Sequence, residues 1–294
     1  MRKSTLLFFP VFLASICLTA YGQSVSSAIK RIDDIASQTL SRLDVPGMAV
    51  AIVKDNEVVL SKGYGVRSVT SGSPVTDSTL FAIASNSKAF TAAALAILVD
   101  RGTIRWDDKV RDHLPYFTLY SPYVSDEFTI RDLLCHRSGL DTFSGDLIWY
   151  GTTHSREQVV KRARFLEPSF GFREQYGYSN IMYLAAGLIV ERVSGMTWDQ
   201  FIAENFFNPM GMTAANTTVS DYQLVNNDFR SKKSRDIAAP HNTVAGKQVA
   251  IDYVNWDNIG PAGSINASVA ELTRWIRLQL GKGTLDGREY WKEQ

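Results

Sequence analysis

The segment 81–100 places a serine and a lysine three residues apart at the front of a run that is apolar on nearly every side. Such a run predicts a helix that is buried all round, and Gly102 predicts where it ends. Residues three apart share a helix face, so the Ser85 hydroxyl and the Lys88 amine are expected to meet. Because burial lowers the pKa of a lysine, this amine can accept a proton from the serine. The pattern therefore predicts a nucleophilic serine with a lysine base.

The motif S-x-x-K is short, and a second copy at Ser27 and Lys30 is interpreted as the surface of an ordinary amphipathic helix. The copy at Ser85 differs in its surroundings, because a lysine otherwise has little reason to lie in the first turn of so apolar a helix. The unpaired N–H groups and the positive end of the helix dipole at that turn also suit a developing oxyanion. This context favours catalysis over a structural role.

A second candidate group is formed by Tyr178 and Asn180, which precede an apolar helix predicted over 181–193. A tyrosine and an amide two residues apart on a loop point the same way, giving one proton shuttle and one group that positions the substrate. Tyr253 and Asn255 have the same spacing, and buried tyrosines that bond the backbone are common. The spacing alone leaves both pairs open.

Residues 1–22 have the features of a signal peptide: two basic residues, an almost wholly apolar run, and small residues shortly before Gln23. The apolar run contains Pro10 and is too short to predict a membrane span. The sequence therefore predicts an exported protein, periplasmic or secreted, whose mature domain covers residues 23–294.

The charge balance and the cysteine content exclude several classes of partner. Removing residues 1–22 deletes two basic and no acidic residues, so the formal charge changes from +1 to −1, which offers no attraction for nucleic acid. Cys135 is the one cysteine left, and the four histidines lack metal-ligand spacing, so no metal or cofactor is expected. A G-x-S-x-G elbow is absent, which argues against an α/β-hydrolase triad.

The order of predicted elements is a helix, a hairpin and then a mostly helical remainder. Residues 26–43 have helical periodicity, and the β-rich runs 48–53 and 58–64 predict the hairpin. A loop rich in Gly, Ser and Thr, 65–79, then leads to Ser85. Capping boxes or close relatives of them predict helix starts at Thr129, Ser155, Thr197 and Ser268.

The segment 236–255 predicts extended chain that turns at Ala245 and Gly246. A hairpin needs further strands to complete a sheet, and no later segment predicts partners for the strands at 48–53 and 58–64. The sheet is therefore expected to be incomplete in this chain.

Five short motifs follow one another along the chain: S-N-S-K (85–88), T-I-R-D-L-L-C-H-R-S-G-L (129–140), Y-S-N (178–180), N-P-M-G-M (208–212) and G-P-A-G-S (260–264). Together they resemble the serine β-lactamase-related hydrolases, in the branch of class C β-lactamases, related penicillin-binding proteins and esterases. Their order and spacing are similar to the family's, and the resemblance extends from residue 26 to the C-terminus. It implies an α/β (α+β) fold of the β-lactamase/transpeptidase type, with an antiparallel sheet and a helical subdomain.

The resemblance also implies roles for the candidate residues. Ser85 would be the nucleophile that accepts the acyl group, its backbone N–H one oxyanion donor, and Lys88 its proton acceptor. Tyr178 would relay protons to the leaving group and to water, and its position before a helix favours it over Tyr253. Asn180 would bond the substrate amide or the lysine. The implied function is hydrolysis through an acyl-enzyme, without a cofactor, of a small-molecule or peptide substrate: an ester, a D-amino-acid peptide or a β-lactam.

One feature of the family is missing. A third motif, K-T-G or H-x-G, is expected on a strand after Trp275, but the K-G-T at 282–284 has the wrong order. The R-S-G at 137–139 lies between the first two motifs and is discounted, and with His136 it is interpreted as shaping a loop. The resemblance therefore predicts a chain truncated at its C-terminus, without the second oxyanion donor and the last strands of the sheet.

The missing motif keeps a second function open. The chain would then be a catalytically inactive scaffold of the same fold, or a binding protein of the cell envelope. The two intact motifs argue against this alternative, and the missing third motif argues for it.

Overall fold

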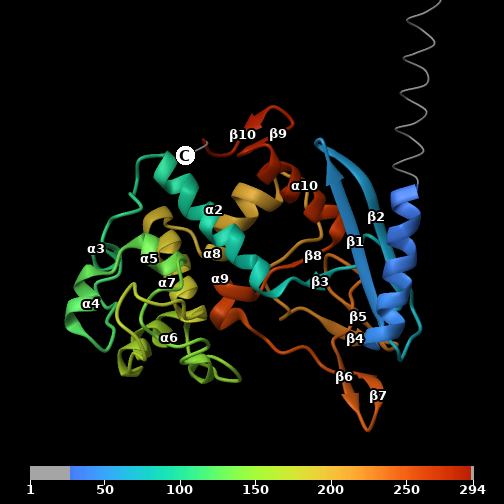
Figure 1. The fold of residues 1–294 in the computed structure, drawn as a ribbon, viewed down its shortest axis with the longest axis horizontal. Coiled ribbons are helices and arrows are strands. Elements are labelled where there is room, and N and C mark those ends of the chain that lie inside the picture. Colours follow the sequence, from blue (N-terminus) through green and yellow to red (C-terminus); the bar gives the residue numbers. More distant parts are fainter. Residues whose placement is uncertain (1–26, 293–294) are drawn as a thin grey trace, which may run out of the picture.

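Helix α2 (Ser87–Asp100) lies at the centre of the molecule, between a group of helices and a β-hairpin (Figure 1). The computed structural model describes residues 27–292, which form a mixed α/β fold. The predicted signal peptide, residues 1–22, lies outside the described residues. Among residues 27–292, no helix has both the length and the apolar character needed to cross a membrane.

The burial of α2 explains why its sequence is apolar on nearly every side. Phe90 and Leu95 have no exposed surface, and the Phe90 ring stacks on Trp275 with the ring centroids 3.8 Å apart. The helix ends at Asp100, and Gly102 has a φ of +71°, the left-handed conformation that commonly ends a helix. The predicted buried helix and its end are confirmed.

The start of this helix differs from the prediction. The sequence predicts Ser85 in the first turn of the α-helix, whereas the structure places it in a 3-10 turn, η1 (Ala84–Asn86), that precedes α2. Ala84 has a φ of +46°, which is sparsely populated for a residue with a side chain and bends the chain sharply before Ser85. Ser85 and Lys88 nevertheless stay within hydrogen-bond distance, because the turn leads directly into α2.

Helices α7 (Asn180–Ser194) and α9 (Gly260–Gly263) pack directly on α2. Gly187 of α7 is required at this contact, because a Cβ there would approach Pro261 Cγ to 2.2 Å. The Thr91 hydroxyl of α2 donates to the Pro261 carbonyl at 2.7 Å. Close packing and this hydrogen bond together fix α9 against the first turns of α2.

Four helices begin at the capping boxes that the sequence predicts. In each box the N-cap side chain and the side chain three positions later bond each other's backbone N–H. The predicted starts are thereby confirmed for α5 (Ile130–Leu134), α6 (Arg156–Arg162), α8 (Trp198–Ile202) and α10 (Val269–Leu280). Further helical segments are α3 (Val110–His113), α4 (Pro122–Glu127), the 3-10 turns η2 (Asp146–Ile148), η3 (Ala163–Phe165) and η5 (Asp257–Ile259), and the π-helical η4 (Ala203–Phe207).

The predicted N-terminal hairpin is confirmed as β1 (Gly47–Lys54) and β2 (Glu57–Gly65), joined through Asp55 and Asn56. Both turn residues have a positive φ, as a two-residue hairpin turn of type I′ requires. Helix α10 packs against the hairpin, and the predicted first helix, described over residues 27–43, lies beside it (Figure 1). Within the described part of the chain, no third strand pairs with these two.

The other strands also come in antiparallel pairs. β3 (Phe81–Ala82) pairs with β8 (Asn266–Ala267), which ties the chain just before Ser85 to a segment far along the sequence. The remaining pairs are hairpins: β4 (Gln223–Val225) with β5 (Asp228–Arg230), β6 (His241–Val244) with β7 (Lys247–Ala250), and β9 (Thr284–Leu285) with β10 (Arg288–Glu289).

The hairpin β6–β7 confirms the extended segment predicted over 236–255. It turns at Ala245 and Gly246 as expected, and both residues have a positive φ. The hairpin β4–β5 was not predicted. Asn226 and Asn227 form its turn in the left-handed conformation, which asparagine tolerates better than most residues. Two adjacent asparagines were therefore the signal for this turn.

The hairpins β4–β5 and β6–β7 share a small core that is separate from the main core around α2. Leu80, which has no exposed surface, packs there with Phe229 and Ile237. The Leu80 backbone also donates to the Asp236 carbonyl and accepts from the Ala238 N–H, both at 2.9 Å. The chain that approaches Ser85 is therefore fixed to this hairpin region.

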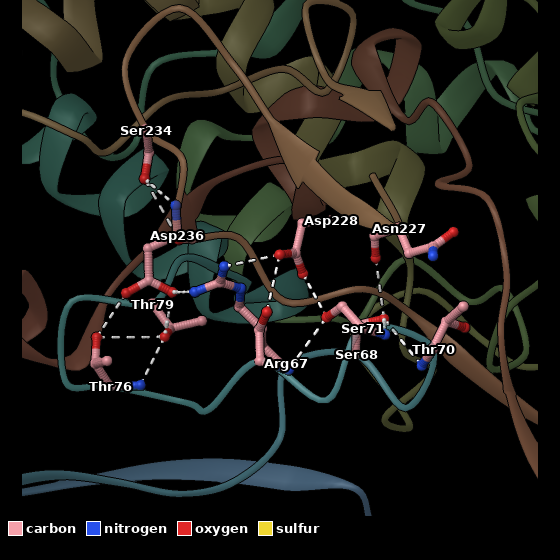
Figure 2. A network of polar contacts seen from close by, with 11 residues as sticks. Arg67, Ser68, Thr70, Ser71, Thr76, Thr79, Asn227, Asp228, Ser234 and Asp236 are labelled. Atoms are coloured by element: carbon pink, nitrogen blue, oxygen red, sulfur yellow. Dashed lines mark hydrogen bonds and ion pairs between the residues drawn. The ribbon is translucent and has the colours of Figure 1, made fainter. Parts of the chain in front are cut away.

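A polar cluster around Arg67 fastens the loop 65–79 to the same region, as Figure 2 shows. The guanidinium lies between two carboxylates and donates to Asp236 at 3.0 Å and to Asp228 at 3.1 Å. Burial raises the pKa of Asp228, but hydrogen bonds from two serines and from Arg67 outweigh burial and hold this pKa below its ordinary value. The loop hydroxyls that bond the two carboxylates belong to Ser71, Ser73, Thr76 and Thr79.

We expect Arg67→Met to lower the free energy of unfolding by about 3 kcal/mol, because it leaves two largely buried carboxylates without their cation. Urea denaturation followed by circular dichroism measures this change. The matched control is Arg131→Met, which removes an exposed ion pair with Asp107 and should cost less than about 1 kcal/mol. Equal decreases in the free energy of unfolding of the two variants would contradict the conclusion that Arg67 stabilises two largely buried carboxylates.

Candidate active site

Lys88, in the first turn of α2, is buried, with 6% of its surface exposed. Its amine donates to Ser85 Oγ at 3.0 Å, to Asn180 Oδ1 at 2.8 Å and to the Ala262 carbonyl at 2.8 Å. Burial lowers the pKa of Lys88 to about 8, although the negative charge of Asp146 opposes this shift. Roughly a tenth of the amine is therefore neutral at pH 7, where an ordinary lysine is almost wholly charged.

The three oxygen neighbours decide what the neutral amine does. Asn180 Oδ1 and the Ala262 carbonyl can only accept hydrogen bonds, because neither atom carries a proton. After losing one proton, Lys88 keeps two N–H groups for these oxygens and turns its lone pair to the remaining neighbour, the Ser85 hydroxyl. The arrangement therefore allows Lys88 to take the proton of Ser85.

Asp146, in the turn η2, sets the orientation of Asn180. The Asn180 amide nitrogen donates to both carboxylate oxygens, at 3.0 and 3.2 Å, so the amide oxygen is turned toward Lys88. Trp149 Nε1 donates to the same carboxylate at 2.9 Å and holds it in place. The carboxylate thus determines that Lys88 faces an acceptor and not a second donor.

Tyr178 reaches the serine from the loop before α7, and its hydroxyl donates to Ser85 Oγ at 2.5 Å. Its ring stacks on His136, with the centroids 4.5 Å apart, and His136 Nδ1 accepts the Ser179 N–H at 3.1 Å. Burial, and after it the charge of Lys88, lower the pKa of His136 to about 4. The imidazole is therefore neutral at pH 7 and serves as an acceptor under the tyrosine, which agrees with its predicted structural role.

Tyr253, the alternative tyrosine, lies in the small core against Phe229 and donates to the Ala238 carbonyl at 2.5 Å. The structure thus brings Tyr178 to the serine and places Tyr253 in a structural contact. The four side chains that the sequence predicts at the site lie together: Ser85, Lys88, Tyr178 and Asn180.

The Ser85 backbone is placed to serve a substrate oxygen. In the turn η1, the first backbone N–H that donates to an earlier carbonyl is that of Asn86, which bonds the Ile83 carbonyl at 3.1 Å. The Ser85 N–H precedes it and has no acceptor within the turn. This N–H can therefore donate to an oxyanion that develops beside the nucleophile.

A cavity of about 280 Å³ opens over these groups. Ser85, Tyr178, Asn180 and Asp146 line one part of it, and the rest of the wall is mostly aromatic and apolar. Among the described residues, no three His, Cys, Asp or Glu side chains are grouped so that they could hold a metal ion. The aromatic and apolar part of the wall includes Phe143, Trp149, Trp256, Ile259 and Ala262.

Sequence reasoning missed Asp146, Trp149, Trp256 and the Ala262 carbonyl. No motif or periodicity marks the first three. Asp146 acts on Asn180 and Trp256 packs on Trp149, and both of these contacts join residues that are distant in the chain. Trp149 bonds Asp146, which lies only three residues earlier, but no known motif marks this pair. Ala262 lies in the G-P-A-G-S segment that resembles the family, yet its hydrogen bond to Lys88 emerges only from the packing of α9 on α2.

Comparison with known proteins identifies the family of this chain. The beta-lactamase family model matches residues 32–294. The unguisins hydrolase ungD' of Aspergillus campestris is 29% identical over 256 residues, which are 84% of this chain and 46% of that protein. Protein flp of Staphylococcus aureus (strain N315) is 30% identical over 258 residues, which are 85% of this chain and 49% of that protein. The chain thus spans about half the length of the curated relatives it matches.

Two solved structures share the fold. The octameric penicillin-binding protein homologue from Pyrococcus abyssi is 24% identical, with a TM-score of 0.72 over 90% of this chain and 58% of that chain. EstCE1, a hydrolase with promiscuous acyltransferase activity, is 16% identical, with a TM-score of 0.75 over 92% of this chain and 76% of that chain. The predicted α/β fold of the β-lactamase/transpeptidase type is confirmed, and the family match over most of its length shows that this chain belongs to the beta-lactamase family.

Proposed function

We propose that the protein is a serine hydrolase that forms an acyl-enzyme on Ser85. The observation that carries this proposal is the hydrogen-bonded set of three side chains, in which Lys88 Nζ and Tyr178 OH lie 3.0 and 2.5 Å from Ser85 Oγ. The serine itself is exposed to the catalytic cavity, so a substrate can reach it. Membership of the beta-lactamase family supports the same class of reaction.

The reaction begins when Ser85 Oγ attacks a carbonyl carbon while the neutral Lys88 amine takes its proton. The carbonyl electron pair moves to the oxygen, where the Ser85 N–H stabilises the charge. The intermediate collapses as the bond to the leaving group breaks, and Tyr178 passes the proton from Lys88 to that group. Water then attacks the acyl-enzyme with the same assistance, the bond to Oγ breaks, and the serine recovers its proton.

Among the substrate classes, the site favours an ester. Both ends of the Asn180 amide are engaged, with Lys88 and with Asp146, so this side chain offers no ready partner for a substrate amide. The described residues that line the catalytic cavity include no arginine or lysine that would bind the carboxylate of a β-lactam or a D-peptide. We propose export of the protein as well, with the composition of residues 1–22 as its support.

Covalent labelling of Ser85 tests the proposal. A fluorophosphonate probe should form a single adduct, because the activated hydroxyl attacks phosphorus as it attacks a carbonyl carbon. Intact mass and peptide mapping locate the adduct, which Ser85→Ala should abolish and Ser27→Ala should leave in place. Labelling that persists in Ser85→Ala would overturn the assignment. A folded protein without any labelling would instead support the inactive scaffold or binding protein.

Asp146→Asn should shift the pH dependence of acylation. The base must be neutral, so the wild-type rate should rise with pH through about 8, the pKa of Lys88, and level off above it. The variant loses the charge that raises this pKa, so the rise should move to lower pH. Stopped-flow release of p-nitrophenol between acid and alkaline pH measures the shift. The control is Asp141→Asn, an exposed carboxylate in the same loop; an equal shift there, or a shift upward in Asp146→Asn, would contradict the assignment.

Tyr178→Phe should slow the turnover of p-nitrophenyl acetate by about 10²–10⁴, the usual contribution of a proton relay. The melting temperature should change little, because the lost hydroxyl bonds only the exposed Ser85. Tyr253→Phe is the matched control: it should keep turnover and lose about 1 kcal/mol of stability with its hydrogen bond to the Ala238 carbonyl. The opposite pattern would identify Tyr253 as the relay.

A further inference from the structure

A second cavity lies directly beside the catalytic one, and the proposed reaction does not use it. It has a volume of about 200 Å³, and the exposed surface of its wall is mostly apolar, although Asp252, Asp257, Ser264 and Asn266 also line it. Trp256 and Gly263 line both cavities. The apolar part of its own wall comes from Ala82, Val219, Pro240, Ile251, Tyr253 and Val254.

Gly263 marks the place where the two cavities adjoin. A Cβ at this position would lie 3.6 Å from the Trp256 ring and 3.8 Å from the backbone of Ala84, the residue before the nucleophile. Because glycine has no side chain, nothing from this position stands between the indole and the catalytic turn. The second cavity therefore begins within one residue of Ser85.

Trp256 adds an independent indication that this region receives a ligand. Its indole Nε1 is buried and has no hydrogen-bond partner within the described part of the chain. Buried donors are nearly always paired in folded proteins, so an unpaired one on a residue that lines both cavities calls for an explanation. An acceptor oxygen of a bound ester would supply the missing partner.

The position of Tyr178 decides which part of an ester this cavity takes. Tyr178 gives a proton to the leaving group, so the alcohol part departs on the Tyr178 side of Ser85. Tyr178 lines the catalytic cavity and is not among the residues of the second cavity, which begins at Gly263 beside Ala84. The acyl chain lies on the opposite side of the carbonyl carbon and is therefore directed to the second cavity.

The volume sets the length of the chain. An apolar cavity of about 150 Å³ accepts benzene, so this one has room for roughly six to eight carbon atoms. We propose, on the basis of the ester hydrolysis proposed above, that the second cavity is the subsite for an unbranched acyl chain of roughly six to eight carbons. The enzyme then prefers esters of medium-chain carboxylic acids to acetyl esters, because each buried methylene adds to the binding of the transition state.

The first test is the dependence of kcat/KM on chain length in p-nitrophenyl esters from acetate to dodecanoate. We expect about a twofold to fourfold gain per methylene as far as octanoate and no gain beyond it. Alkyl acetates with alcohols of the same lengths should show no such gain, because their chains lie on the Tyr178 side. Rates that are independent of acyl length, or that follow alcohol length instead, would overturn the proposal.

Two variants fill the second cavity and leave the catalytic one unchanged. Val254 and Ile251 line the second cavity and not the catalytic one, and their exposure of 45% and 41% leaves room for a larger side chain without disturbing the core. Val254→Trp and Ile251→Trp should each hydrolyse the acetate ester as the wild type does. In both variants the ratio of kcat/KM for the octanoate ester to kcat/KM for the acetate ester should fall by about tenfold or more. Val244→Trp is the matched control, since this exposed valine of β6 lines neither cavity. A preference for octanoate that persists in both variants would contradict the assignment of the second cavity as the acyl-chain subsite.

Binding measured without catalysis separates the subsite from the proposed function. Ser85→Ala cannot be acylated but keeps the second cavity, so calorimetry should show octanoate binding at least about tenfold more tightly than acetate. Adding Val254→Trp should remove this difference, and adding Val244→Trp should not. Equal hydrolysis of acetate and octanoate esters, together with no binding of octanoate, would leave the hydrolase function standing and refute the subsite. Octanoate binding without hydrolysis of any ester would refute the hydrolase function and leave the subsite standing.

Discussion

The site depends on one buried amine, that of Lys88. Taking an ammonium group out of water is unfavourable, and three oxygen atoms compensate for part of this by accepting its hydrogen bonds. The uncompensated part lowers the pKa of Lys88 to about 8. The same burial that is unfavourable for the charged form is what makes the lysine able to accept a proton from Ser85.

The three oxygen atoms belong to segments far apart in the chain, so their meeting at Lys88 depends on helix packing. Gly187 lets α9 approach α7 closely, and the hydrogen bond between Thr91 and the Pro261 carbonyl fixes α9 on α2. This places the Ala262 carbonyl next to the amine. Asp146 acts on the third oxygen atom indirectly. It accepts hydrogen bonds from the Asn180 amide nitrogen, and this turns the amide oxygen toward the lysine.

The hairpin region β4–β7 supports the site from the other side. The ion pairs of Arg67 with Asp228 and Asp236, together with the backbone hydrogen bonds of Leu80, fix the chain that precedes the 3-10 turn to this region. These contacts are largely buried. The segment after β7 also supplies Ile251 and Val254 to the wall of the second cavity. One set of contacts therefore holds both the turn that carries the nucleophile and the proposed subsite for the acyl chain.

The sequence by itself determined the features whose causes lie within a few residues: the buried helix α2, the hairpin β1–β2, the four capped helix starts and the proximity of Ser85 and Lys88. The position of Tyr178 before a helix, as in the family that the chain resembles, distinguished it from Tyr253, because the spacing of the two tyrosine–asparagine pairs is the same. Only the tertiary structure decided that Ser85 lies in a 3-10 turn, that Asp146 orients Asn180, and that Trp256 and Gly263 join two cavities. These features arise where α7 and α9 pack against α2 and where β3 pairs with β8. Such contacts join residues that are distant in the chain, and they leave no periodic pattern in the sequence.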